Sequence, residues 1–334
     1  MHSITKSIQS DLDRSLESVR TLGHGLVRPE CVLATATGDF YSADWRGGVA
    51  HLHPDGAQSL YAGTAPDGIT LKPNGIALLR NGDFLVTHLG DEEGGVYKLQ
   101  RSGQVSPWLM SVDGLDLPPT NFVVEDGQGR FWITVSTRLM PRSLGYRSTC
   151  NDGFIVMVSG QGARIVADGL GYTNEVALHP NGRWLYVNET FARRLSRFAL
   201  HPDGTLGPKE VVVEFGAGTF PDGLAFDEEG GVWIVSIISN RLIHVAADGK
   251  PTVWMEDSDA EHLSWVEAAY KAGALARPHL DGIKSRLLRN ISSIAFCGPG
   301  RRNAVLGCLL ADHLFTLPMP IAGVAPTHWN YPLS

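Results

Sequence analysis

One short phrase recurs along the chain and constrains its fold more than any other feature. Each copy has a turn-like opening, one polar residue, and an apolar run that ends in a glycine-rich turn. The polar residue carries a side-chain oxygen in all six copies, which are Glu30, Asn74, Asn121, Asn174, Asp222 and Ser292. The copies lie 44 to 53 residues apart, except for a last interval of 70 residues. Periods of this length are typical of the blades of a β-propeller.

The segments between these copies support the same fold class. Each repeat contains short apolar runs separated by turn residues, which is the pattern of an antiparallel meander. The chain contains 38 glycines and 19 prolines, a composition that suits many tight turns. Strands do not alternate with helices, so a doubly wound α/β fold is excluded. Two all-β sandwiches are the alternative, but sandwiches do not repeat one polar residue at the equivalent position of every structural unit. We therefore predict an all-β protein, a six-bladed β-propeller over residues 23–334.

Three segments fall outside the blade pattern. Residues 1–22 carry apolar side chains at helical spacing, so we expect an N-terminal helical segment. An insertion is predicted at about residues 137–152 in the third blade. A second, helical insertion is predicted at about residues 256–289, before the last blade. The sixth blade lacks a fourth strand, which either terminus could supply.

Composition excludes several classes of function and partner. The net charge of −7 gives no basic surface for nucleic acid. No apolar run is long enough to cross a membrane, and the N-terminal stretch lacks the apolar core of a signal peptide. The four cysteines are scattered and form no Cys-x-x-Cys pair. We therefore expect reduced thiols and a cytoplasmic protein. The oligomeric state is not indicated by the sequence.

The aligned polar residues point to a bound cation. Equivalent positions on the inner strands of a propeller lie at one height and face the central channel. The carboxylates of Glu30 and Asp222 would repel each other there unless a positive charge lay between them. Carboxylate and amide oxygens are the ligands that a hard cation prefers. The alternative is that these residues open turns, where Asn and Asp often bond their own backbone.

Several longer motifs resemble those of a known family. They lie at residues 121–132, 173–187 and 221–227. They are similar to the motifs of the SMP-30/gluconolactonase/LRE family of six-bladed propeller lactonases. The resemblance implies one catalytic divalent ion in the channel. Its ligands would be Glu30, Asn121, Asn174 and Asp222.

The chain departs from the family pattern at two of these motifs. The first ligand is usually followed by Gly-Pro, whereas this chain has Cys31 and Val32. The asparagine of the third blade is commonly followed by aspartate, whereas this chain has Phe122, which implies a more apolar substrate pocket. Asn74 is an additional residue near the axis, interpreted first as a turn residue and second as a substrate contact.

The predicted chemistry is hydrolysis of a small-molecule lactone with one divalent ion. The resemblance suggests Asp222 as the proton acceptor, with Glu189 as a second candidate, and His88 as a residue that could line the mouth. All-oxygen ligation favours Ca²⁺, with Zn²⁺, Mn²⁺ or Fe²⁺ as alternatives. No Gly-x-Ser-x-Gly elbow or His-Glu-x-x-His signature is present, which disfavours a serine esterase and a zincin. The remaining alternatives are an arylesterase or organophosphate hydrolase on the same site, and a non-catalytic metal-binding scaffold.

Overall fold

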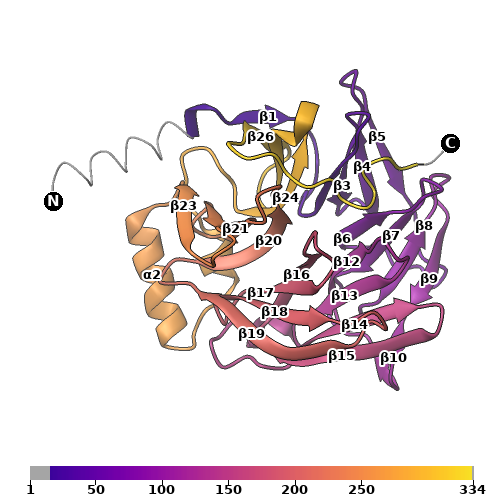
Figure 1. The fold of residues 1–334 in the computed structure, drawn as a ribbon, viewed down its shortest axis with the longest axis horizontal. Coiled ribbons are helices and arrows are strands. Elements are labelled where there is room, and N and C mark those ends of the chain that lie inside the picture. Colours follow the sequence, from indigo (N-terminus) through magenta and orange to yellow (C-terminus); the bar gives the residue numbers. More distant parts are fainter. Residues whose placement is uncertain (1–15, 333–334) are drawn as a thin grey trace.

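Six antiparallel sheets form a closed ring in the computed structural model, which describes residues 16–332 (Figure 1). Each sheet has four strands. The innermost strand of each sheet contacts the innermost strand of the next, and the last of them contacts the first. The predicted six-bladed β-propeller is therefore confirmed.

The strands follow one another outward from the axis in the first five blades. The first blade contains β2 (Val32–Ala34), β3 (Phe40–Asp44), β4 (Gly48–Leu52) and β5 (Gln58–Ala62). The second contains β6 (Pro73–Leu78), β7 (Phe84–His88), β8 (Val96–Leu99) and β9 (Val105–Leu109). The third contains β12 (Thr120–Glu125), β13 (Phe131–Val135), β14 (Gly153–Ser159) and β15 (Gly162–Leu170). The fourth contains β16 (Thr173–Leu178), β17 (Trp184–Glu189), β18 (Arg194–Leu200) and β19 (Leu206–Glu214). The fifth contains β20 (Phe220–Phe226), β21 (Val232–Ile237), β22 (Arg241–Val245) and β23 (Pro251–Met255).

The sixth blade joins the two ends of the chain. Its inner strands are β24 (Ile291–Cys297), β25 (Asn303–Cys308) and β26 (Leu314–Pro318). The fourth strand is β1 (Arg20–Leu22), which pairs antiparallel with β26. The N-terminal side therefore closes the ring, an outcome that the sequence had left open. This pairing ties the first described strand to the last blade and removes an open sheet edge.

A buried aspartate fixes the turn between the first two strands in two of the blades. Asp126 accepts hydrogen bonds from the indole of Trp132 (3.1 Å) and from Nε of Arg130 (2.6 Å). Asp227 accepts the equivalent indole bond from Trp233 (3.0 Å). Both indoles are almost fully buried. The repeated Asp-Gly-rich turn thus anchors an aromatic side chain of the second strand between neighbouring blades.

The segments outside the blades differ in part from the prediction. The N-terminal helix predicted over residues 1–22 falls mostly outside the described residues, and the last three residues of that range form β1. The loop between β13 and β14 contains a short 3-10 helix, η1 (Arg142–Gly145). The loop between β23 and β24 contains α2 (Ala260–Lys271) and α3 (Arg277–Asp281). A short hairpin of β10 (Ser111–Val112) and β11 (Leu115–Asp116) was not predicted.

The η1 loop and the α2–α3 segment share one hydrophobic cluster. Tyr146 and Cys150 follow η1, and Val266, Leu275 and Leu280 belong to the α2–α3 segment. They pack with residues from the edges of the fourth, fifth and sixth blades, which are Tyr172, Phe191, Phe220, Ile237, Ile238 and Leu309. Both inserted segments therefore cover the same end of the propeller. Within residues 16–332, no helix is long and apolar enough to span a membrane.

Candidate metal centre

A break in strand pairing marks the polar residue on five of the six inner strands. The register between the first and second strands shifts around Asn74, Asn121, Asn174, Asp222 and Ser292. The sixth polar residue, Glu30, lies just before β2. A β-bulge bends the strand and redirects a side chain, and bulges are frequent next to active sites. The bulges explain why one polar residue on each of these five inner strands departs from simple strand pairing.

The glycine after two of these residues is required by packing. A Cβ atom on Gly75 would lie 2.6 Å from Cα of Phe122, and one on Gly223 would lie 2.6 Å from Cα of Ser293. Both glycines lie inside strands, and neither has a positive φ. The Asn74-Gly75 and Asp222-Gly223 pairs are therefore not turns. They are places where the inner strands of neighbouring blades approach too closely for a side chain.

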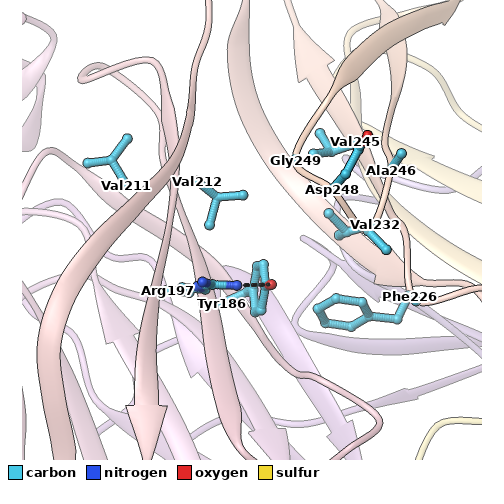
Figure 2. Close-up of a pocket in the computed structure, with 12 residues that line it drawn as sticks. Tyr186, Arg197, Val211, Val212, Phe226, Val232, Val245, Ala246, Asp248 and Gly249 are labelled. Atoms are coloured by element: carbon cyan, nitrogen blue, oxygen red, sulfur yellow. Dashed lines mark hydrogen bonds between the residues drawn. The ribbon is translucent and has the colours of Figure 1, made fainter.

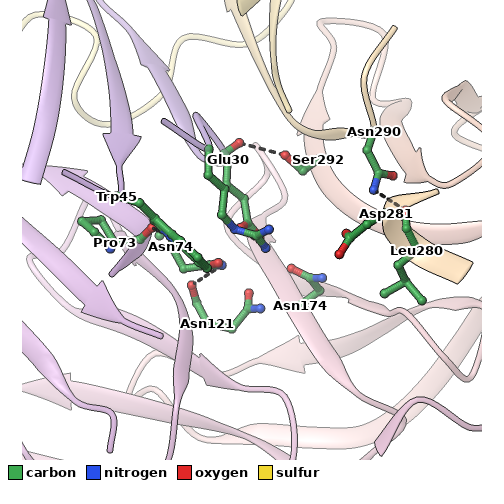
Figure 3. Close-up of polar contacts among 12 residues, drawn as sticks. Glu30, Trp45, Pro73, Asn74, Asn121, Asn174, Leu280, Asp281, Asn290 and Ser292 are labelled. Atoms are coloured by element: carbon green, nitrogen blue, oxygen red, sulfur yellow. Dashed lines mark hydrogen bonds and ion pairs between the residues drawn. The ribbon is translucent and has the colours of Figure 1, made fainter. Parts of the chain in front are cut away.

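Four of the polar side chains come together in the channel. Figure 3 shows Glu30, Asn74, Asn121 and Asn174 pointing toward a common space. These four and Asp222 are each at most 7 % exposed. The structure thus brings together four residues from four different blades, up to 144 positions apart in the sequence.

Side chains of the second strands and of neighbouring blades hold the backbone of this column. Nδ2 of Asn74 donates to the carbonyl of Asn121 (3.0 Å), and Nδ2 of Asn188 donates to the carbonyl of Asp222 (2.9 Å). The hydroxyl of Ser292 donates to the carbonyl of Glu30 (3.1 Å) (Figure 3). These bonds are accepted by backbone oxygens and do not occupy the carboxylate and amide oxygens of the column. Such supporting contacts orient ligands before an ion binds.

Two buried amide oxygens of the column, Oδ1 of Asn74 and Oδ1 of Asn121, have no hydrogen-bond partner among residues 16–332. A third, Oε2 of Glu30, accepts no hydrogen bond there, and its charged neighbour is Arg28 at 3.0 Å. An unsatisfied buried acceptor costs about 1–3 kcal/mol, so several of them in one place call for a positively charged partner. Two carboxylates with amide oxygens are a donor set that suits a hard divalent cation. The residues present therefore fit such an ion.

One arginine also reaches this column. Nη2 of Arg28 lies 3.0 Å from Oε2 of Glu30, and both side chains are nearly buried. The guanidinium of Arg28 lies over the ring of Trp45, 4.6 Å from its centroid. Burial lowers the pKa of Arg28, while the charge of Glu30 opposes that change. The sequence analysis predicted a metal ion as the positive charge near Glu30. In the structure, Arg28 supplies part of that charge.

The carboxyl groups around the column have strongly altered proton affinities. Burial raises the pKa of Asp222 well above its usual range, and the charges of Glu30 and Glu175 raise it further. Burial also raises the pKa of Glu175 to about 8. A cation would reverse this effect by favouring the ionised carboxylates. Ion binding is therefore expected to release protons from the column.

The η1 loop adds a second arginine to this environment. Arg142 is half-buried, and no carboxylate within residues 16–332 forms an ion pair with it. Burial alone would lower the pKa of Arg142, but Tyr172, Tyr146, Glu30 and Asp222 outweigh burial and raise it. A guanidinium without a partner is costly inside a protein, so it is a candidate binding group for an anion or a polarised carbonyl.

The remaining predicted substrate contacts lie in different surroundings. Asn74 belongs to the column (Figure 3), whereas Phe122 lines a separate, mainly apolar cavity. His88 is buried, and its Nδ1 accepts a hydrogen bond from the backbone N–H of Lys72 (3.0 Å). Its Nε2 lies 3.7 Å from Glu93, and burial lowers its pKa. His88 therefore supports the loop before β6 in the structure.

Glu189 is held in a network of its own. Its oxygens accept hydrogen bonds from Arg194 (2.7 Å), from the hydroxyl of Ser196 (2.6 Å) and from the backbone N–H of Gly171 (2.6 Å). The side chain is fully buried. Burial acts to raise its pKa, but these donors outweigh burial and lower it. We therefore give Glu189 no role in proton transfer.

Two cavities lie outside the polar column. The larger, about 570 Å³, is lined mainly by apolar residues that follow the column along the inner strands, such as Cys31, Phe122 and Leu224. Because these positions come later on each inner strand, this cavity opens toward the end of the propeller that carries the turns between the first and second strands. The smaller, about 190 Å³, lies between the fourth and fifth blades (Figure 2). Its lining of Tyr186, Arg197 and several valines offers no set of groups for hydrolysis.

The structure also reveals residues that the sequence analysis missed. Arg28 and Arg142 approach the column from loops, and no repeat pattern marks them. A separate cluster of Asp39, His51 and His53 brings potential metal-ligating atoms within 4.8 Å of one another. A signal for it was present, because His51 and His53 are two residues apart and so face the same side of a strand.

The fold and the column together define a closed six-bladed propeller with a candidate cation site on its axis. Comparison with known families gives a match to the SMP-30/gluconolactonase/LRE-like region over residues 28–256. The chain therefore belongs to this family, as its motifs had indicated.

Individual relatives agree with this assignment. A 6-deoxy-6-sulfogluconolactonase from Pseudomonas putida is 30% identical over 171 residues, which is 48% of this chain and 56% of that protein. The chain thus spans little more than half the length of this relative. A gluconolactonase from Xanthomonas campestris superimposes with a TM-score of 0.63 at 17% identity, covering 90% of this chain and 89% of the other. The calcium-binding protein regucalcin from Agrobacterium tumefaciens gives 0.65 at 17% identity, covering 90% and 92%. These two structures support the fold alone.

Proposed function

We propose that this protein is a hydrolase that opens a small lactone with the help of one divalent cation. The observation that carries the proposal is the group of buried oxygens in the channel: Oδ1 of Asn74 and of Asn121 have no hydrogen-bond partner among residues 16–332, and the Glu30 carboxylate beside them is paired with Arg28. Membership of a family that includes lactonases supports the reaction, and the regucalcin described as calcium-binding supports the ion. The ligands would be Glu30, Asn121, Asn174 and Asp222. When bound, the cation would polarise the ester carbonyl and stabilise negative charge on its oxygen.

The chain itself would position the substrate and the attacking water. We assign Asp222 the role of proton acceptor, because it is the column carboxylate without an ion pair to Arg28. Arg142 would bind an oxygen of the substrate from the η1 loop, since no carboxylate of the described residues forms an ion pair with it. Asn74 would bind the water or the substrate through its free Oδ1. The α2–α3 segment and the η1 loop would exclude bulk water at this end of the channel.

All-oxygen ligation makes Ca²⁺ the ion that we propose, with Mn²⁺, Zn²⁺ or Fe²⁺ as alternatives. The four cysteines are unpaired and buried, which supports our further proposal of a reducing, cytoplasmic location.

Metal analysis combined with a lactone assay tests the proposal. Glu30→Gln and Asp222→Asn should each lower both ion occupancy of the channel and turnover of lactones, while the exposed Glu229→Gln serves as a matched control. Chelation should abolish turnover, and return of the ion should restore it. Ion binding without turnover of lactones or aryl esters would support a non-catalytic scaffold instead. Full activity in Asp222→Asn would refute the assignment of this residue.

A further inference from the structure

A second group of potential ligands lies at the far end of the first blade. Asp39 lies in the turn between β2 and β3, and His51 and His53 lie at the end of β4 and just beyond it. Glu30, by contrast, precedes β2. With about 3.3 Å per strand residue, the two places are on the order of 15 Å or more apart along the blade. This group is therefore separate from the channel.

The three side chains already converge. Nε2 of His51 lies 2.7 Å from Oδ1 of Asp39. The rings of His51 and His53 are in contact, with centroids 3.6 Å apart. One ligand-type atom from each residue falls within 4.8 Å of the others. In a tetrahedral metal site, ligand atoms at about 2.0–2.2 Å from the ion lie a little over 3 Å from one another. Small rotations of the side chains would thus suffice to complete the coordination.

Neighbouring residues orient each of the three groups. The other oxygen of Asp39 accepts a hydrogen bond from the hydroxyl of Thr37 (2.5 Å). Nδ1 of His51 lies 3.2 Å from the hydroxyl of Tyr61, and Nε2 of His53 lies 3.1 Å from the hydroxyl of Ser59. Outer contacts of this kind fix the orientation of ligating carboxylates and imidazoles. The ring of His51 is also stacked on Tyr41, with centroids 4.3 Å apart.

From this geometry we propose a second metal site, formed by Asp39, His51 and His53, that binds a transition-metal ion such as Zn²⁺. Two imidazoles and one carboxylate are borderline ligands, which favour Zn²⁺ over Ca²⁺. His51 is 4% exposed and the side chain of Asp39 is 20% exposed, so the site is anchored in the blade but open toward solvent. The ion would replace the direct contact between Asp39 and His51 and would link the β2–β3 turn to the end of β4. Its role would be structural.

This site has a consequence for the channel. The all-oxygen ligands of the channel and the nitrogen-containing ligands of the first blade would favour different ions. Zinc in the purified protein would therefore not by itself identify the ion of the channel, because the first blade would bind zinc too. The proposal does not depend on lactone hydrolysis.

Titration of the full-length, metal-free protein with Zn²⁺ tests the site, using a chromophoric chelator as competitor. His53→Ala and Asp39→Asn should each weaken one class of Zn²⁺ binding by at least about tenfold. The exposed His201→Ala should leave it unchanged. The test is best made in the Glu30→Gln background, where the channel no longer contributes. There, Zn²⁺ should raise the unfolding temperature, and added His53→Ala should remove that rise.

The outcomes separate this proposal from the function of the channel. Co²⁺ should give visible ligand-field absorption that is lost in His53→Ala and retained in Glu30→Gln. Equal Zn²⁺ binding by the Glu30→Gln protein with and without His53→Ala would overturn the second site. So would Zn²⁺ binding that disappears in Glu30→Gln alone. Loss of lactone turnover in Glu30→Gln with unchanged Zn²⁺ binding would leave both assignments standing.

Discussion

Replacement of Glu175 by glutamine should change how the stability of this protein depends on pH. Glu175 follows Asn174 on β16, is 6% exposed, and accepts a hydrogen bond from the backbone N–H of Leu224 (3.3 Å). Burial raises its pKa to about 8. Glutamine has nearly the same shape, can accept the same hydrogen bond, and carries no charge at any pH. The variant therefore removes the titration while keeping the packing.

The magnitude follows from the difference between the folded and unfolded states. Below about pH 4 the carboxyl is protonated in both states and has no effect. Between the ordinary value of 4.5 and the folded value of about 8, only the unfolded chain ionises, so the free energy of unfolding falls as the pH rises. At about 1.4 kcal/mol per pKa unit, the loss is about 3 kcal/mol at pH 7 and levels off near roughly 5 kcal/mol above pH 9.

Denaturant unfolding of both proteins from pH 4 to 9, in the presence of a chelator, measures this difference. Other titrating groups are common to the two proteins, so the difference between the two curves reports the charge of Glu175 together with its effect on Asp222. Glu175→Gln should match the parent protein near pH 4 and become more stable by about 3 kcal/mol at pH 7. A difference that stays constant from pH 4 to 9 would show that Glu175 ionises normally in the folded protein. The reasoning from burial would then be refuted.

Three further substitutions address the channel and its support. Arg28→Met should increase the affinity of the channel for a divalent cation by about tenfold, because Glu30 loses its competing partner; weaker binding in a calorimetric titration would show that Arg28 supports the site. Arg142→Ala should lower kcat/KM for a lactone by about 10- to 100-fold without lowering the unfolding temperature, and unchanged kinetics would remove Arg142 from the substrate site. Asp126→Asn should cost about 3 kcal/mol of stability through its bonds to Arg130 and Trp132, with activity per folded molecule retained; an unfolding free energy equal to that of the parent would contradict this role.

The sequence by itself determined the architecture and the position of the column. The spacing of Asn74, Asn121, Asn174 and Asp222 predicted both the blades and the register, because each blade is a local unit whose strands are close in sequence. An antiparallel meander is marked by alternating apolar and polar side chains and by turn residues, and both can be read directly from the sequence. The prediction of a shared polar column therefore needed no tertiary information.

Only the tertiary structure decided which groups surround that column. Arg28 reaches the column from a loop, Arg142 from the inserted η1 segment, and Glu175 from the strand position next to Asn174. Their charges shift the pKa of Asp222 because burial has removed the screening water. Tertiary contacts also pair Glu189 with Arg194, which is why we give Glu189 no role in proton transfer, and they place β1 beside β26. These outcomes depend on residues far apart in the chain, so no local pattern could foretell them. The contact between Asp39 and His51 also depends on the folded structure, because the pairing of the strands brings these two residues together.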